Sequence, residues 1–348
     1  MKTVHDRSST LFAPQPADLV IHPPHTRPQL IVIIDGEEEF DWQTLSSAAT
    51  DVRSMRCQEP AQRLLNRHDI VPTYVIDYPV ASQEDGYRPL LDFLADGRCE
   101  VGTQLHPWVN PPLEERVCQA NSFAGNLCTY LEREKLRRLT DVITDNLGVR
   151  PVVYKAGRYG LGTHTAAIVG ELGYQIDSSV MPCTDYSAQC GPNYLTCPSV
   201  PYWIGPERRL LEIPTTVGIT GLLSGLNPAC YGGLFGTLGH RLRVPGMLAR
   251  LRLLERIRLT PEGILIADAI RLTRALVDRG LRLFVVSYHS PSLVPGCTPY
   301  VQTRQDLALF LDWLERYFDF FFGELEGEPT TPCHLREQAL QLRQPLHA

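Results

Sequence analysis

Carboxylate, amide and imidazole side chains spaced two residues apart stand out in this sequence. Asp35 and Glu37 are two positions apart, and Gln104 and His106 have the same spacing. In extended backbone, residues i and i+2 point to the same side, so each pair would project into one site. One carboxylate could then bind a metal ion while the other accepts a proton from water. His289 ends a further apolar run, where it could act as a general acid.

The same residues also have simpler structural interpretations. Glu38 and Glu39 are typical of a solvated acidic turn. His106, next to a proline and a tryptophan, could be a histidine packed in the core, and His289 could be satisfied by a backbone carbonyl. Arg158 could orient a carboxylate, bind substrate or form a purely structural ion pair. These alternatives remain open at the level of single residues.

The candidate residues follow short apolar runs, which are typical of strands buried on both faces. Lys155 and Glu212 likewise lie at the ends of such runs. The predicted strands are Leu30–Asp35, Ile70–Ile76, Cys99–Leu105, Val152–Tyr154, Leu210–Ile213 and Leu281–Tyr288.

Helical patterns separate these runs, and several carry end signals. Gly148 is a candidate C-terminal glycine, and Thr303 with Asp306 resembles a capping box. Thr163 and Thr260 are further candidate N-caps. Alternation of strands and helices predicts parallel β/α units, in which the carboxyl ends of the strands converge on one mouth. The predicted helices are Gln58–Arg67, Pro89–Ala95, Leu131–Leu147, Thr163–Leu172, Pro261–Arg279 and one beginning at Thr303.

We expect three parts in the chain: an extended arm over 1–28, a β/α barrel over 29–329 and a tail over 330–348. The glycine-rich apolar segment 213–239 is too broken to span a membrane, and we interpret it as a loop acting as a lid. The segment Arg241–Arg258 interleaves six arginines with apolar residues. It predicts an amphipathic helix that covers the barrel, with a membrane-surface helix as the alternative.

Composition narrows the function classes. The chain has 348 residues, 43% of them hydrophobic, and a formal net charge of −6, which argues against nucleic acid or an anionic membrane as main partner. No secretory signal is visible, so we expect a cytoplasmic protein with ten reduced cysteines. Only the even spacing of Cys183, Cys190 and Cys197 suggests a metal or redox device, and buried thiols are the simpler interpretation.

Six segments, taken in order, resemble the polysaccharide deacetylases of the NodB-homology group (carbohydrate esterase family 4), specifically the cytosolic WalW-type branch. The resemblance runs from about Gln29 to Pro329. Each segment alone is a weak signal, but the six together in this order are a strong signal for the fold. The segments are Ile33–Trp42, Glu100–Pro112, Ala156–Gly160, Asp177–Ser179, Leu211–Pro214 and Ser287–Gly296.

This resemblance implies a distorted (β/α)7 barrel that hydrolyses N-acetyl groups with a divalent metal, most often zinc. Carried onto this sequence, Asp35 is the base, Glu37 and His106 are metal ligands and His289 is the acid. Arg158 tethers Asp35. Further substrate contacts are expected from Trp108, Tyr159, Glu212 and Tyr288.

Gln104 departs from the family pattern, because it stands where the family has its first metal-binding histidine. An amide oxygen is a poorer zinc ligand than imidazole. The predicted ligand set is therefore Glu37, His106 and Gln104, with weakened metal binding or a site without metal.

The sequence thus predicts a metal-dependent hydrolase that cleaves the C–N bond of an N-acyl amide in an amino sugar or small metabolite. Two alternatives stay open: a metal-free acid–base enzyme with a biosynthetic role on a less polar metabolite, and a non-catalytic binding protein on the same barrel. We expect a small-molecule or glycan substrate, no nucleic-acid partner and no membrane span. A homo-oligomer is left open.

Overall fold

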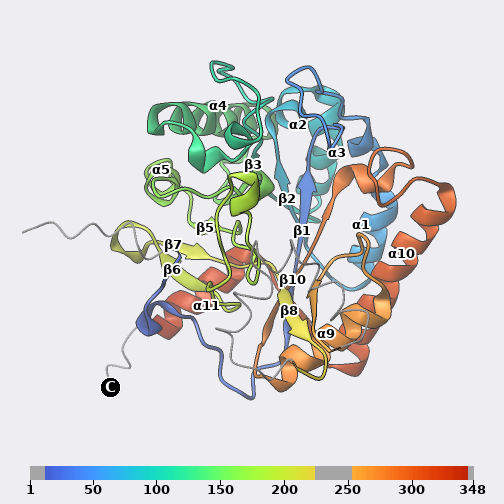
Figure 1. Ribbon diagram of the computed structural model, residues 1–348. Helices are drawn as coiled ribbons and strands as arrows, with labels where there is room; N and C mark the ends of the chain where they lie inside the picture. The colour runs from blue at the N-terminus through green and yellow to red at the C-terminus, as the bar shows by residue number, and fades with distance from the viewer. Residues whose placement is uncertain (1–11, 224–252, 344–348) are drawn as a thin grey trace, which may run out of the picture.

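A computed structural model describes residues 12–223 and 253–343, and its centre is a curled sheet of mostly parallel strands (Figure 1). The sheet order is β10-β1-β2-β3-β4-β5-β7-β6, with β11 added beside β1. Among the described strands of this sheet, β6 is the one that pairs antiparallel, with β7. The strands are β1 (Gln29–Gly36), β2 (Thr73–Ile76), β3 (Glu100–Leu105), β4 (Val153–Ala156), β5 (Ile176–Asp177), β6 (Tyr202–Ile204), β7 (Leu210–Glu212), β10 (Leu283–His289) and β11 (Glu328–Pro329).

A separate two-stranded antiparallel sheet, β8 (Val217–Thr220) with β9 (Glu255–Arg258), lies beside β10. Thr216, just before β8, accepts a hydrogen bond at its Oγ1 from the backbone N–H of Val285 in β10 (2.7 Å). This small sheet therefore lies next to β10, the strand at one edge of the main sheet. In the described part of the chain, the sheet is a half-barrel of parallel strands, which confirms the predicted α/β barrel class.

Helices cover the outer face of the sheet (Figure 1). Short apolar strands connected by helices of this kind are the usual solution for a parallel sheet, because both of its faces must be buried. Within the described residues no helix is long and apolar enough to cross a membrane. The helices are α1 (Glu59–Arg67), α2 (Tyr78–Ser82), α3 (Glu84–Ala95), α4 (Thr129–Leu147), α5 (Thr165–Glu171), α9 (Ile266–Asp278), α10 (Arg304–Phe318) and α11 (Pro332–Arg343).

Alternation along β1 decides which side chains reach the barrel interior. Ile31 and Ile33 belong to an interior cluster with residues such as Val153, whereas Leu30 and its i+2 partners pack in the cluster shared with the helices. Asp35 continues the inward series of Ile31 and Ile33. The sequence therefore puts a carboxylate directly above an apolar interior layer.

Several predicted element boundaries are confirmed. Gly148 ends α4 in the left-handed conformation, at φ 70°. The capping box of Thr303 and Asp306 begins α10. The six predicted strands all form, each within a few residues of its predicted bounds.

Other local predictions are wrong. The helix predicted to begin after Thr260 starts only at Ile266, because Thr260 instead accepts a hydrogen bond from the backbone N–H of Glu262 in a turn. The cap of α5 is His164 rather than Thr163, and α3 begins five residues before Pro89, which it contains. The end of the predicted arginine-rich helix, 255–258, forms strand β9, while 224–252 lies outside the described residues.

The two terminal segments lie on the barrel where they are described. Leu19 of the predicted arm forms a β-bridge with Tyr202, and Pro24 accepts a hydrogen bond from Arg282. In the predicted tail, α11 places Leu335 and Ala339 in the interior cluster. Both segments thus contribute contacts to the fold.

A buried pair of carboxyl groups on neighbouring strands gives a pH-dependent prediction. Asp177 of β5 lies opposite Glu212 of β7. Burial, followed by the charge of Asp177, raises the pKa of Glu212 well above its usual range, and burial raises the pKa of Asp177 to about 7. A carboxyl whose pKa is raised on folding stabilises the fold while protonated, so this contribution is lost as pH rises from about 4 to 7.

We therefore expect Asp177→Asn to flatten this loss, because the amide imitates the protonated acid. Urea unfolding at pH 4.5 and 7.5 should give similar stabilities for wild type and variant at the lower pH. At the higher pH the variant should gain on the order of 2 kcal/mol. A stability difference that does not change with pH would contradict the raised pKa of Asp177.

Candidate active site

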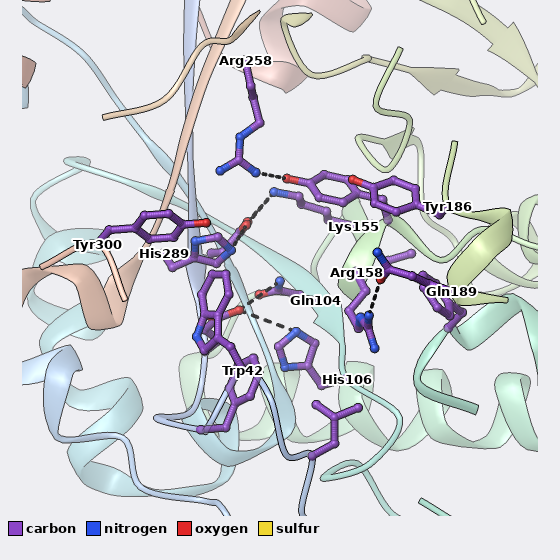
Figure 2. Close-up of a pocket in the computed structure, with 17 residues that line it drawn as sticks. Trp42, Gln104, His106, Lys155, Arg158, Tyr186, Gln189, Arg258, His289 and Tyr300 are labelled. Carbon is purple, nitrogen blue, oxygen red and sulfur yellow. Dashed lines mark hydrogen bonds and ion pairs between the residues drawn. The ribbon is translucent and has the colours of Figure 1, made fainter. Parts of the chain in front are cut away.

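A cavity of about 400 Å³ lies where the carboxyl ends of β1, β3, β4 and β10 meet (Figure 2). It brings together Asp35, Glu37, Gln104, His106 and His289, the residues that the sequence singled out for their spacing and strand ends. The remaining lining residues are Phe40, Trp42, Leu45, Phe123, Lys155, Ala156, Arg158, Tyr159, Tyr186, Gln189, Arg258 and Tyr300.

Asp35 forms a buried ion pair with Lys155. The Lys155 Nζ lies 2.6 Å from Oδ1 and 2.7 Å from Oδ2 of Asp35, and the aspartate is only 2% exposed. Burial by itself lowers the pKa of the lysine, but the charge of Asp35 and its hydrogen bond outweigh this and raise it. Lys155 therefore stays protonated and holds both oxygens of Asp35.

This contact corrects the predicted role of Arg158. The guanidinium of Arg158 donates to Ser122 Oγ (2.7 Å) and to Gln189 Oε1 (2.9 Å), so it does not tether Asp35. The physical reason is the strand alternation: Lys155 is on β4 and faces inward, whereas Arg158 follows the end of the strand in a short 3-10 turn. Lys155 was visible in the sequence at a strand end, but its type alone did not mark it as the partner.

His289 lies next to Asp35 and is oriented by Glu262. Its Nδ1 is 2.7 Å from Glu262 Oε2, and its Nε2 is 3.6 Å from Asp35 Oδ2. Asp35 and His289 are also register neighbours on β1 and β10. Burial tends to raise the pKa of Glu262, but His289, Arg258 and the hydroxyl of Ser292 together lower it to about 2. Glu262 is therefore an ionised acceptor that fixes the imidazole.

The role of Glu262 was missed because the sequence predicted it in the first turn of a helix. In the structure it lies in the loop before α9, fully enclosed, and its Oε1 accepts hydrogen bonds from the backbone N–H of His289 (3.0 Å) and from Ser292 (2.6 Å). The only signal available was an acid close to a turn. Its partner His289 is 27 residues further along the chain.

His106 has a matching arrangement with Glu38. Its Nδ1 lies 2.8 Å from Glu38 Oε2, and the indole of Trp108 donates to Glu38 Oε1 (2.7 Å) while stacking on the imidazole. Burial lowers the pKa of His106 to about 4, so the ring is neutral. Because Glu38 accepts the Nδ1 proton, the lone pair is on Nε2, which faces Glu37 at 3.6 Å. The prediction that Glu38 is solvated is wrong: it is fully buried.

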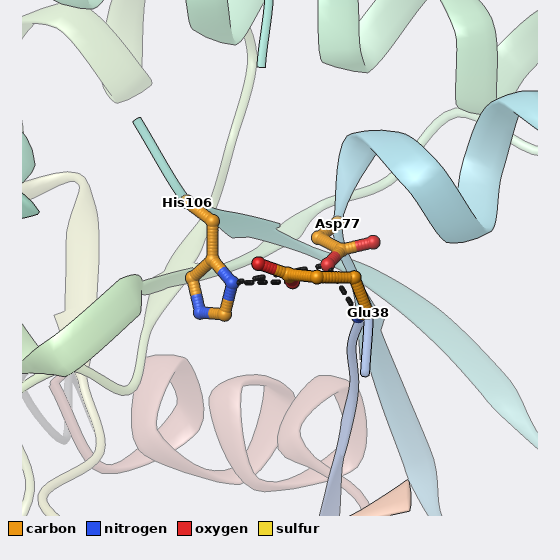
Figure 3. Close-up of side chains that lie close together, drawn as sticks. All are labelled: Glu38, Asp77 and His106. Carbon is orange, nitrogen blue, oxygen red and sulfur yellow. Dashed lines mark hydrogen bonds and ion pairs between the residues drawn. The ribbon is translucent and has the colours of Figure 1, made fainter. Parts of the chain in front are cut away.

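Glu38, Asp77 and His106 form a cluster that could hold a metal ion, since one ligand atom from each lies within 4.8 Å of the others (Figure 3). Protein groups already satisfy these atoms. Besides the bonds of Glu38, Asp77 caps α2 by accepting from Val80 N–H (2.9 Å), and it accepts from the Glu38 N–H (2.8 Å). The cluster is therefore better suited to fixing the orientation of His106 than to binding an ion.

The predicted ligands Glu37 and Gln104 have unsatisfied oxygens instead. Glu37 Oε1 and Gln104 Oε1 are buried without a hydrogen-bond partner. Burial and the charges of Glu38 and Asp35 raise the pKa of Glu37 well above its usual range. One carboxylate oxygen and one amide oxygen without partners, together with the Nε2 lone pair of His106, fit a divalent cation, although the amide makes the set weaker for zinc than two imidazoles would be.

Three of the predicted substrate contacts lie outside the cavity lining. Tyr288 faces the helices, where its ring packs against Phe310 (5.3 Å), because it alternates with the inward His289. Glu212 likewise alternates with the inward Leu211 and accepts from the backbone N–H of Val180. Trp108 lies behind His106. Tyr159 is the predicted contact that lines the cavity.

The sequence reasoning also missed most of the aromatic wall. Trp42 packs edge-on against His289 with ring centroids 4.7 Å apart, and Tyr300 lies against Trp42 at 5.5 Å. On the other side Tyr159 stacks parallel to Tyr186. These residues follow the ends of β1, β4, β5 and β10, so no local pattern in the sequence connects them.

Several solved protein structures share this architecture, although no sequence comparison finds a relative. No protein-family model and no curated protein matches the sequence. Among solved structures, a protein described as a polysaccharide deacetylase from Mycobacterium smegmatis aligns with a TM-score of 0.55 at 16% identity, over 94% of this chain and 96% of that chain. The chain has the polysaccharide deacetylase fold.

Two further structures share this fold. The PuuE allantoinase aligns with a TM-score of 0.51 at 15% identity, over 95% of this chain and 99% of that chain. A protein described as a polysaccharide deacetylase from Pseudomonas aeruginosa PAO1 gives 0.51 at 15% identity, over 94% and 96%. At these identities the likeness is one of fold, and the chemistry must be argued from the residues of this chain.

The Asp35–Lys155 pair gives a stability prediction. Lys155→Met leaves Asp35 buried without its cation, and we expect a loss of about 3–5 kcal/mol in the free energy of unfolding. The double variant Asp35→Asn, Lys155→Met removes both charges and should recover part of that loss. Urea denaturation of the single and double variants measures this, and strictly additive losses would contradict the pairing.

Gly157 supports His106 by leaving room for it. A Cβ at Gly157 would lie 2.3 Å from His106 Cδ2 and 2.5 Å from the Leu105 carbonyl oxygen. We expect Gly157→Ala to displace the imidazole and to lower the free energy of unfolding by about 1–3 kcal/mol. The matched control is Gly170→Ala in α5, where nothing lies within 4 Å, and it should be neutral or slightly stabilising. Equal effects of the two substitutions would contradict the steric argument.

Proposed function

We propose that this protein is a hydrolase that cleaves the C–N bond of an N-acyl amide in an amino sugar or small metabolite. The observation that supports this best is the pair of glutamate-oriented histidines, Glu38–His106 and Glu262–His289, whose Nε2 atoms both face one cavity beside Asp35. A histidine held at Nδ1 by a carboxylate is prepared to bind a ligand or transfer a proton at Nε2. Two such pairs around one buried aspartate favour a reaction over simple binding.

In the proposed reaction, water attacks the acyl carbon, and the C–N bond breaks to give a carboxylic acid and an amine. Asp35 is the general base that accepts a proton from the water, and Lys155 orients both of its oxygens. His289 is the general acid, which protonates the leaving amine from Nε2. Glu262 stabilises the imidazolium form of His289 during this exchange.

Glu37, His106 and Gln104 are the residues that would hold a divalent cation, with zinc as the first candidate. When bound, such an ion supplies Lewis-acid polarisation of the acyl carbonyl. The supporting observations are the unsatisfied oxygens of Glu37 and Gln104 and the neutral imidazole of His106. Glu38 and Trp108 keep that imidazole in place.

The proposal predicts that purified protein releases free amine from N-acetylated amines, measured with an amine-reactive fluorophore. Asp35→Asn and His289→Asn should each lower kcat by about 100-fold or more, the range of general acid–base contributions. The matched control is His334→Asn, on the exposed side of α11, which should retain wild-type activity.

Removal of metal separates the alternatives. If a chelator abolishes turnover and zinc restores it, the metal-dependent hydrolase is supported. Turnover that is unaffected by the chelator but lost in Asp35→Asn supports the metal-free acid–base enzyme. If none of the tested N-acyl amides is hydrolysed but some of them still bind, the result would favour a binding protein over a hydrolase.

A further inference from the structure

Among the residues that the structure describes, the cavity lining contains one lysine and two arginines, and two of these three side chains have a carboxylate partner. Lys155 is bound by both oxygens of Asp35. Arg258, from β9, lies 3.7 Å from Glu262 and donates to the Tyr159 hydroxyl (3.3 Å). The charges of these two residues are thus balanced by the protein itself.

Arg158 differs, because its hydrogen-bond partners are all neutral. It donates to Ser122 Oγ and Gln189 Oε1, and its guanidinium lies over the ring of Phe123, 4.7 Å from the centroid. Among the residues that the structure describes, it forms no ion pair with a carboxylate. The sequence from 213 to 254 contains no aspartate or glutamate, so residues 224–252 cannot provide a carboxylate side chain either.

The backbone holds Arg158 at the cavity at a conformational cost. Arg158 and Tyr159 both have left-handed backbone angles, with φ of 53° and 59°. Non-glycine residues in this region are uncommon, and they are concentrated at functional sites. Arg158 and His106, one of the candidate metal ligands, line the same cavity (Figure 2).

A partly buried guanidinium that has no counter-ion among the described residues gains stability when a ligand provides the negative charge. Carboxylates fit this group well, since the planar fork of arginine can bind both oxygens. Across the cavity from Arg158 lie the aromatic side chains of Trp42 and Tyr300 (Figure 2). A small molecule with a carboxylate near an apolar or flat group would match both features.

We propose that the substrate is an N-acyl amide carrying a free carboxylate, of the N-acylated amino-acid type, whose carboxylate is bound by Arg158. This deepens the proposed function and rests on it for the reaction, but not for the binding of the anion. Arg158 then selects acidic substrates over neutral acetylated sugars. It is a specificity-determining residue that contacts the substrate away from the scissile bond.

Isothermal titration calorimetry with two matched probes tests the binding. The probes are N-acetyl-L-phenylalanine and its neutral amide, N-acetyl-L-phenylalaninamide. We expect wild type to bind the acid about tenfold or more tightly than the amide, as charged hydrogen bonds imply. In Arg158→Gln the preference should fall below about threefold. Arg138→Gln, which removes an exposed charge on α4, should retain the wild-type preference.

Release of amine from the same probes and from N-acetylglucosamine oligomers separates the two proposals. Carboxylate-dependent binding without hydrolysis would overturn the hydrolase and leave the anion site standing. Hydrolysis of the neutral sugars, with no preference for the acid, would overturn the anion site and support the hydrolase. The anion site would also be overturned by three binding results. These are equal binding of acid and amide by wild type, no binding of either probe, and an unchanged preference for the acid in Arg158→Gln. Thermal unfolding of each variant verifies that it is folded.

Discussion

An ionised carboxylate at the end of the central strand needs a cation in direct contact, and the rest of the site is arranged around that requirement. Asp35 is enclosed by the sheet, where an unpaired charge would cost several kcal/mol. Lys155 meets it from β4, across the mouth of the half-barrel. The pair fixes the relative position of the strands and keeps one carboxylate available beside His289, whose Nε2 lies 3.6 Å away.

His106 and His289, on opposite sides of the Asp35–Lys155 pair, are oriented in the same way. A buried glutamate accepts the Nδ1 proton of each, so the tautomer and ring direction are set and Nε2 is presented to the cavity. The surroundings differ in charge. Glu38 shares its site with the carboxyl of Asp77, whereas Glu262 lies close to Arg258 and is held ionised. The site thus combines a neutral ligand-type imidazole with one prepared for proton transfer.

Much of the fold could be predicted because the signals are local. A continuous apolar run such as Leu30–Ile34 is stable only as a strand covered on both faces, and the cap residues of α4 and α10 act within one turn of their helices. The errors occurred where local propensity was overruled by contacts. Residues 255–258 carry a helical pattern but pair with β8, and Thr260 serves a turn that positions Glu262.

The sequence by itself determined the parallel β/α class and the set of strand-end residues Asp35, Glu37, Gln104, His106 and His289. Both follow from local features of the chain, namely the alternation of side chains along a strand and the order of strands and helices. Only the tertiary structure decided the partners: Lys155 for Asp35, Glu262 for His289 and Glu38 for His106. These contacts join residues distant in the chain, and they form because burial makes an unpaired charge or donor costly. Which acid meets which base depends on strand register and inward direction, and residue type alone specifies neither.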